Sequence, residues 1–205
     1  MIPTVDGRPI PVDISGPEKG SVVVLLGAAQ QSTAAYDPLC ERLHTANLRT
    51  VVLGADAGLT PKSVLGILDV IGVRWAVLVG DRAGADLAWE LAASRLDRFT
   101  GLVVIDRAHP RVADPAGVAR DPDCPAVEMN TTALVSSPAA RAAVTASQRY
   151  VYGDFRVVDM LVKRTAQEAT AQLAAEIVMR TSTWSTQVRA RARLLRRLLR
   201  GPRRR

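Results

Sequence analysis

Hydrophobic runs alternate with helical patterns along the first half of the chain. Four short apolar runs, rich in valine, leucine and isoleucine, are typical of strands that are buried on both faces of a sheet. These runs cover residues 21–26, 49–53, 75–79 and 101–105. Between them, apolar residues recur at three- and four-residue spacing, which predicts helices over 36–46, 62–71 and 83–94. The alternation predicts an α/β fold, with a mostly parallel, doubly wound sheet flanked by helices.

The pattern is less regular in the second half of the chain. Residues 110–129 combine prolines, a glycine and charges of both signs, so we expect a loop or a short helix there. A strand over 131–135 and a helix over about 138–149 follow. The last two predicted elements are a strand over 155–160 and a helix over 165–179.

The C-terminal segment carries most of the positive charge. Nine arginines lie in the last 17 residues, and without them the formal net charge of +7 becomes −2. Over residues 187–200, leucines gather on one helical face and arginines on the other. We therefore predict a domain of residues 1–183, followed by a basic amphipathic helix and arginine-rich tail over residues 184–205.

The charge of this tail indicates which partners it would bind. An anionic membrane surface, an acidic protein and a polyanion all fit, and the expected contacts are Arg193, Arg196, Arg197 and Arg200. In the alternative, the leucines pack on the domain and the arginines only face solvent. Arginine outnumbers lysine 24 to 3 in the whole chain, so an arginine-rich tail also follows from composition alone.

Composition excludes several other classes of protein. Of the 205 residues, 48% are hydrophobic and 23% charged, so the chain can bury a core and is not intrinsically disordered. No apolar run approaches the ~18–20 residues that span a bilayer, and the N-terminus lacks a secretory signal pattern. Cys40 and Cys124, with His44 and His109, support neither a disulfide framework nor a metal site. We expect a cytoplasmic protein without cofactor or metal, peripheral at the membrane if the tail binds lipid; a homodimer stays open.

Three segments carry a resemblance to a known family. Residues 4–10 look like a short opening hairpin, and residues 23–32 look like a strand followed by an oxyanion loop. Gly80-Asp81-Arg82-Ala83-Gly84 has the spacing of a G-x-S-x-G nucleophile elbow, within a matching stretch from Leu65 to Asp106. The chain therefore resembles the α/β-hydrolase family. Only about twenty residues, 108–125, are available where many members insert a cap, so the resemblance implies a capless domain.

The same resemblance implies that the hydrolytic machinery is lost. Arg82 stands at the nucleophile position, and a guanidinium offers no lone pair for attack. Gly27-Ala28 replaces the His-Gly of the oxyanion loop, and no histidine follows the predicted strand 155–160. The usual position of the acid holds Ser136-Ser137. The leading hypothesis is thus a non-catalytic protein that binds a ligand or a partner.

Two alternatives to this hypothesis remain at this point. Dehalogenase and epoxide hydrolase relatives use an aspartate at the elbow, so an unorthodox hydrolase would combine Asp81, Asp106 and His109. The other alternative is an interaction module that acts through the basic tail.

Arg82 itself has two interpretations. With the neighbouring Gly27 and Ala28 it would bind an anionic ligand at the start of a helix. Otherwise it forms an internal ion pair with Asp81, Asp56 or Asp106, which we consider the better-supported interpretation.

Overall fold

The computed structural model describes residues 2–3, 7, 9–54, 56, 58–160 and 165–199. Side chains are described for the same residues except Pro3 and those beyond residue 182.

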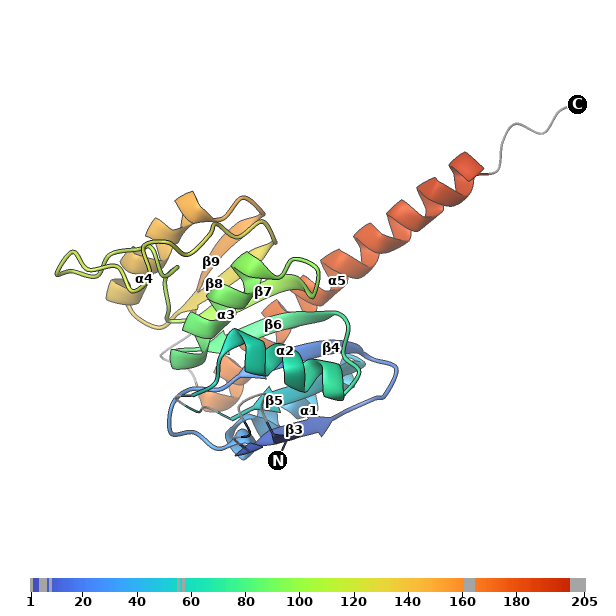
Figure 1. Ribbon diagram of the computed structural model, residues 1–205, viewed down its shortest axis with the longest axis horizontal. Coiled ribbons are helices and arrows are strands. Elements are labelled where there is room, and N and C mark those ends of the chain that lie inside the picture. The colour runs from blue at the N-terminus through green and yellow to red at the C-terminus, as the bar shows by residue number, and fades with distance from the viewer. Residues whose placement is uncertain are drawn as a thin grey trace, which may run out of the picture.

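A seven-stranded sheet forms the centre of the molecule, with the strand order β3-β5-β4-β6-β7-β8-β9 (Figure 1). The strands are β3 (Val12–Ser15), β4 (Ser21–Leu26), β5 (Leu48–Leu53), β6 (Ala76–Asp81), β7 (Phe99–Ile105), β8 (Thr131–Val135) and β9 (Phe155–Asp159). All neighbours are parallel except β3, which pairs antiparallel with β5 at the edge. The predicted parallel sheet is therefore confirmed.

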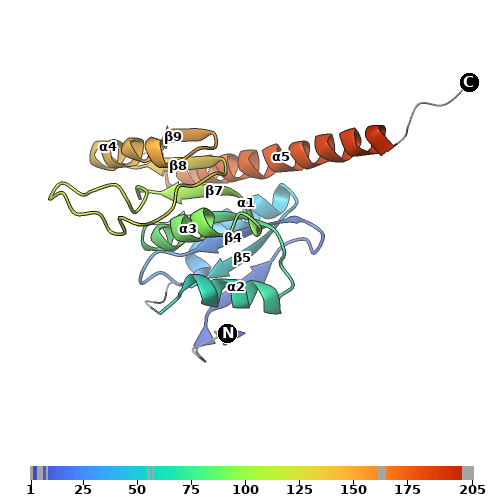
Figure 2. The ribbon, with the colours of Figure 1, turned by 45° about the horizontal axis from the view of Figure 1, so that its top comes forward.

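Helices cover both faces of this sheet (Figure 2). On one face lie α2 (Pro61–Val70), α3 (Ala83–Ser94) and α4 (Pro138–Thr145), with the 3₁₀ turn η2 (Ala146–Tyr150) after α4. The other face carries α1 (Asp37–Thr45), preceded by the 3₁₀ turn η1 (Thr33–Tyr36), and the first part of α5 (Ala166–Leu199). Successive strand residues point to opposite faces, so the core is divided into two apolar layers. Val23 and Leu25, for example, pack toward α1, whereas Val24 and Leu26 pack toward α2 and α3.

Local sequence signals explain several element boundaries. The Thr60 hydroxyl accepts a hydrogen bond from the Ser63 N–H at the start of α2. At the N-terminus, β1 (Ile2–Pro3) pairs antiparallel with β2 (Pro9–Ile10), at the place of the expected hairpin. The other residues of that hairpin include 4–6 and 8, which lie outside the described residues.

The last helix differs from the sequence prediction. Two helices were expected, over 165–179 and 187–200, whereas α5 runs without interruption from Ala166 to Leu199. The residues between the two predicted helices contain neither glycine nor proline, so nothing breaks the backbone hydrogen bonding. The boundary predicted at residue 183 falls inside this helix, and the C-terminal half extends past the edge of the sheet (Figure 1).

Arg180 fastens α5 to the sheet. Its side chain is only 6% exposed, and its Nε donates to the Thr132 Oγ1 at 2.6 Å. One terminal nitrogen donates to the Thr131 carbonyl at 2.9 Å, and the other reaches the exposed Asp154 carboxylate at 2.8 Å. The guanidinium thus satisfies polar groups of β8 that helix packing hides from water.

We expect Arg180→Ala to destabilise the protein by about 2–4 kcal/mol, because it leaves the buried Thr131 and Thr132 acceptors without a donor. Asp154→Ala removes only the exposed ion pair, so its cost should stay below about 1 kcal/mol. Urea denaturation of both variants checks this. Equal losses would show that the ion pair, and not the hidden threonine groups, holds the helix.

Candidate functional site

The turn between β6 and α3 has the geometry of an elbow. Arg82 is the single residue between the two elements, and its backbone has φ 45° and ψ −101°, a region that side-chain-bearing residues rarely adopt. A Cβ on Gly80 would lie 2.5 Å from the Ala85 Cα, and a Cβ on Gly84 would lie 2.2 Å from the Leu26 carbonyl oxygen. Glycine is therefore required on both sides of Arg82, so that the helix can pack directly onto β6 and β4.

The Arg82 side chain forms an ion pair with its neighbour Asp81. The Arg82 Nε lies 3.4 Å from the Asp81 Oδ1, and the arginine side chain is 58% exposed, whereas that of the aspartate is 7% exposed. Of the three carboxylates considered as partners, the structure pairs Arg82 with this one. Asp106 instead accepts hydrogen bonds from the Ser136 N–H and hydroxyl, each at 2.6 Å.

Asp81 is held from the other side by Tyr36. The Tyr36 hydroxyl donates to the Asp81 Oδ2 at 2.9 Å and accepts from the Ala28 N–H at 2.8 Å. Burial raises the pKa of Tyr36 to about 12, so the phenol stays neutral and keeps its donor proton. The carboxylate of Asp81 is thus held between the Tyr36 hydroxyl and the Arg82 guanidinium.

The loop after β4 has its amide groups engaged. The Gly27 N–H donates to the Leu53 carbonyl at 3.1 Å, and the Ala28 N–H donates to Tyr36. In an oxyanion hole such N–H groups must point at a developing negative charge. The two residues proposed for ligand contact therefore have backbone donors that already serve the protein's own oxygens.

His109 lies in a separate, buried environment. Its Nδ1 accepts from the Arg111 N–H at 3.2 Å, so its Nε2 carries the proton that is shared with the Pro125 carbonyl at 3.0 Å. The ring packs against Trp89 and Tyr150, and burial lowers its pKa. These contacts make His109 a neutral anchor for the loop between β7 and β8.

The three residues of the unorthodox hydrolase hypothesis are therefore not brought together. Asp81 bonds Tyr36, Asp106 bonds Ser136, and His109 bonds the Pro125 carbonyl. No hydrogen bond or ion pair joins any two of these three described side chains.

A cleft opens beside the elbow, at the carboxyl ends of β4, β5 and β6. It has a volume of about 980 Å³ and is bounded by the loop after β4, the starts of α2 and α3, and the loop between β7 and β8. Its apolar lining includes Leu26, Leu59 and Leu87. Its charged lining consists of Asp56, Asp86, Glu90, Arg120 and Asp121.

Two carboxylates of the cleft, Asp86 and Glu90 on α3, differ in their electrostatic surroundings. Asp86 is paired with Arg107 at 2.7 Å and with Arg120 at 2.9 Å. Burial raises the pKa of Glu90, and the negative charge of Asp121 raises it further. Of these two α3 carboxylates, Asp86 is paired with two arginines, whereas Glu90 forms no ion pair within the described residues.

Tyr36 and this cleft are the site features that sequence reasoning missed. Tyr36 is the first residue of the helix predicted over 36–46, and the available signal is that a buried tyrosine hydroxyl requires a polar partner. The cleft could not be found in this way, because its residues come from four segments far apart in the sequence.

Two of the sequence expectations concern metal binding and membrane crossing. Within the part of the chain that the structure describes, no three His, Cys, Asp or Glu side chains gather closely enough to hold a metal ion. No described helix combines the length and apolarity that crossing a bilayer requires.

Solved structures with a similar architecture include hydrolases. A hydrolase from Pseudomonas aeruginosa PA01 is 14% identical, with a TM-score of 0.63 over 78% of this chain and 89% of that one. An epoxide hydrolase from Vigna radiata is 13% identical, with a TM-score of 0.64 over 84% and 93%. A haloalkane dehalogenase loop variant from Bradyrhizobium elkanii is 11% identical, with a TM-score of 0.66 over 88% and 98%. No family profile and no curated protein matches the sequence.

The chain therefore has the α/β-hydrolase fold, as its sequence resemblance implied. The described residues form no cap domain, and the connection between β7 and β8 is a loop. At these identities the similarity concerns the fold, and activity has to be argued from the site itself.

Tyr36→Phe should destabilise the protein by about 2–4 kcal/mol, because it leaves the buried Asp81 Oδ2 and the Ala28 N–H without their hydrogen-bond partner. Tyr152→Phe is the matched control, since that side chain is 76% exposed. Chemical denaturation measures both. A loss below about 0.5 kcal/mol in Tyr36→Phe would contradict the role assigned to the hydroxyl.

Proposed function

We propose that this protein is a non-catalytic member of the α/β-hydrolase fold that binds a small ligand in the cleft beside the elbow. The observation that carries the proposal is Arg82 at the strained position between β6 and α3. A permanently protonated guanidinium is no nucleophile at neutral pH.

The surroundings of Arg82 support the same conclusion. Covalent catalysis at an elbow needs a nucleophile, a base within hydrogen-bond reach and free donors for the oxyanion. Asp81 is buried and bonded to Tyr36, and the Ala28 N–H serves that same hydroxyl. His109 is fully buried, with both ring nitrogens engaged by the backbone.

The hydrolase alternative has fold similarity in its favour. Epoxide hydrolase and dehalogenase are among the similar structures. Such an enzyme would require Asp81 to leave Tyr36, and His109 to leave its pocket between Trp89 and Tyr150. We therefore rank it below ligand binding.

A second candidate function rests on α5. The helix extends past the sheet, and the sequence of its far half alternates leucine and arginine clusters (Figure 1). A basic amphipathic helix held away from the body suits an anionic membrane surface better than a solvated face of the domain. In this proposal the protein is cytoplasmic and associates peripherally with the membrane. Side chains beyond residue 182, including the four proposed arginine contacts, lie outside the described ones.

The first test of the proposal is esterase activity. The protein and its Arg82→Ser variant should give no turnover of p-nitrophenyl esters and no labelling by a fluorophosphonate probe, because an introduced serine has no base beside it. Arg82→Ala is the matched control for the loss of the guanidinium. Robust turnover and labelling of the serine variant would mean that a base and an oxyanion hole are present, and the non-catalytic proposal would fail.

The tail proposal is tested by vesicle co-sedimentation. The intact protein should bind phosphatidylserine-containing vesicles, and binding should fall steeply as salt screens the exposed charges. Replacing Arg193, Arg196, Arg197 and Arg200 with glutamine should abolish binding, whereas replacing the same four with lysine should preserve it. Equal binding by the glutamine and lysine variants would show that the positive charge of these arginines does not cause membrane binding.

A further inference from the structure

We infer that the cleft takes a ligand with an apolar body and a protonated amine or similar organic cation. This inference rests on the proposed function, because it names the class of ligand that the cleft binds. It follows from the shape, the lining and the unbalanced charge of the cleft.

The floor and sides of the cleft are apolar. Leu26 at the end of β4 lies at the base, and Leu59 and Leu87 come from the segments on either side. A space of about 980 Å³ with such a lining suits a drug-sized organic molecule, since pockets of this kind bury most of a ligand's surface. The apolar body of the ligand is assigned to this part.

The charges on the walls do not balance. Arg120 is the one cationic side chain among the described lining residues, and with Arg107 it is committed to Asp86. Asp56, Glu90 and Asp121 also line the cleft, and within the described residues none of these three forms an ion pair with a lysine, arginine or histidine. The wall therefore presents net negative charge to the ligand.

Two of these carboxylates, Glu90 and Asp121, lie close enough to repel each other. They belong to α3 and to the loop between β7 and β8, both are exposed to solvent, and both line the same cleft. Burial raises the pKa of Glu90, and the nearby negative charge of Asp121 adds to the effect. A positive group placed between them would relieve this repulsion, whereas an anion would increase it.

The arrangement favours an organic cation over a metal ion. No described group of three His, Cys, Asp or Glu side chains is close enough to coordinate a metal. The Asp56 and Asp121 side chains also accept hydrogen bonds from the Gly58 and Asp123 N–H groups, which fix them in local turns. Separate carboxylates around an apolar space match a monovalent ammonium on an apolar body better than a divalent ion, which needs several oxygen ligands gathered at one point.

Three isosteric probes test the inference by isothermal titration calorimetry: 4-phenylbutylamine, 4-phenylbutan-1-ol and 4-phenylbutyrate. The amine should bind about fivefold to tenfold more tightly than the alcohol, as expected for an ammonium that pairs with two exposed carboxylates. The anion should bind more weakly than the alcohol. Leu87→Trp, which fills the cleft, should weaken all three and so locate the binding.

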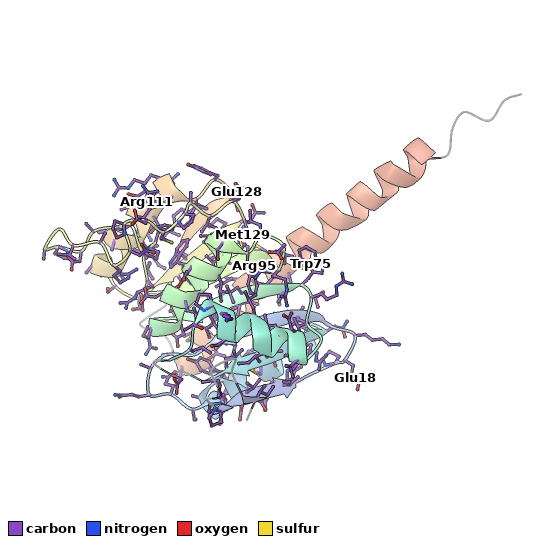
Figure 3. The ribbon with its side chains drawn as sticks, viewed as in Figure 1. Glu18, Trp75, Arg95, Arg111, Glu128 and Met129 are labelled. Atoms are coloured by element: carbon purple, nitrogen blue, oxygen red, sulfur yellow. The ribbon has the colours of Figure 1, made fainter. Side chains whose placement is uncertain are left out.

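Charge variants of the full chain assign the preference to named residues. Glu90→Gln and Asp121→Asn should each reduce the preference for the amine over the alcohol severalfold while leaving alcohol binding unchanged. Glu18→Gln is the matched control, because Glu18 is exposed in the turn before β4, at the opposite end of the strands (Figure 3). Glu90→Gln removes a carboxylate from an unfavourable site, so it should not lower stability in urea denaturation.

The outcomes separate this inference from the proposed function. If the alcohol or the butyrate binds at least as tightly as the amine, the inference about charge is overturned while ligand binding stands. If none of the three probes binds, the inference is overturned as well, and the non-catalytic proposal is decided by the esterase assay. An amine preference that survives both Glu90→Gln and Asp121→Asn would also overturn the assignment.

Discussion

The close approach of α3 to β6 and β4 is the constraint on which the rest of the site depends. Gly80 and Gly84 permit this approach because a Cβ at either position would overlap neighbouring backbone. The packing leaves room for one residue to reverse the chain, and that residue must take a strained, positive φ. The turn lifts Arg82 to the surface, directs Asp81 beneath it, and sets the start of α3 as one wall of the cleft. The geometry of a catalytic fold is thus retained with a different residue at its apex.

Polar groups around the elbow contact mainly one another, and the buried Asp81 Oδ1 accepts no hydrogen bond. The Tyr36 hydroxyl links the Asp81 carboxylate to the Ala28 N–H, and Arg82 compensates the remaining carboxylate oxygen at longer range. A site prepared for catalysis keeps such groups free to meet a substrate. The nearby cleft is different, because its exposed carboxylates Glu90 and Asp121 form no ion pair within the described residues.

The sheet and its helices could be predicted because their signals are local. Each parallel strand is a short apolar run, and each early helix has its own periodicity, so residues 21–26 and 83–94 were placed correctly from sequence. The elbow also has a local signature, two glycines four residues apart. The Tyr36 contacts with Asp81 depend on the tertiary packing of α1 against the sheet, and the cleft depends on loops brought together by the strand order. The length of α5 differs from the prediction because the segment between the two predicted helices lacks their apolar periodicity but continues the helical backbone.

The uninterrupted backbone of α5 determines how the two ends of the molecule relate. A helix rises about 1.5 Å per residue, so the part beyond residue 182 holds residue 199 roughly 25 Å away from the sheet-packed part. The helix leaves the body on the side of Glu18 (Figure 3). The cleft opens at the other end of the strands. A large partner bound to the far half of α5 would therefore leave the cleft unobstructed.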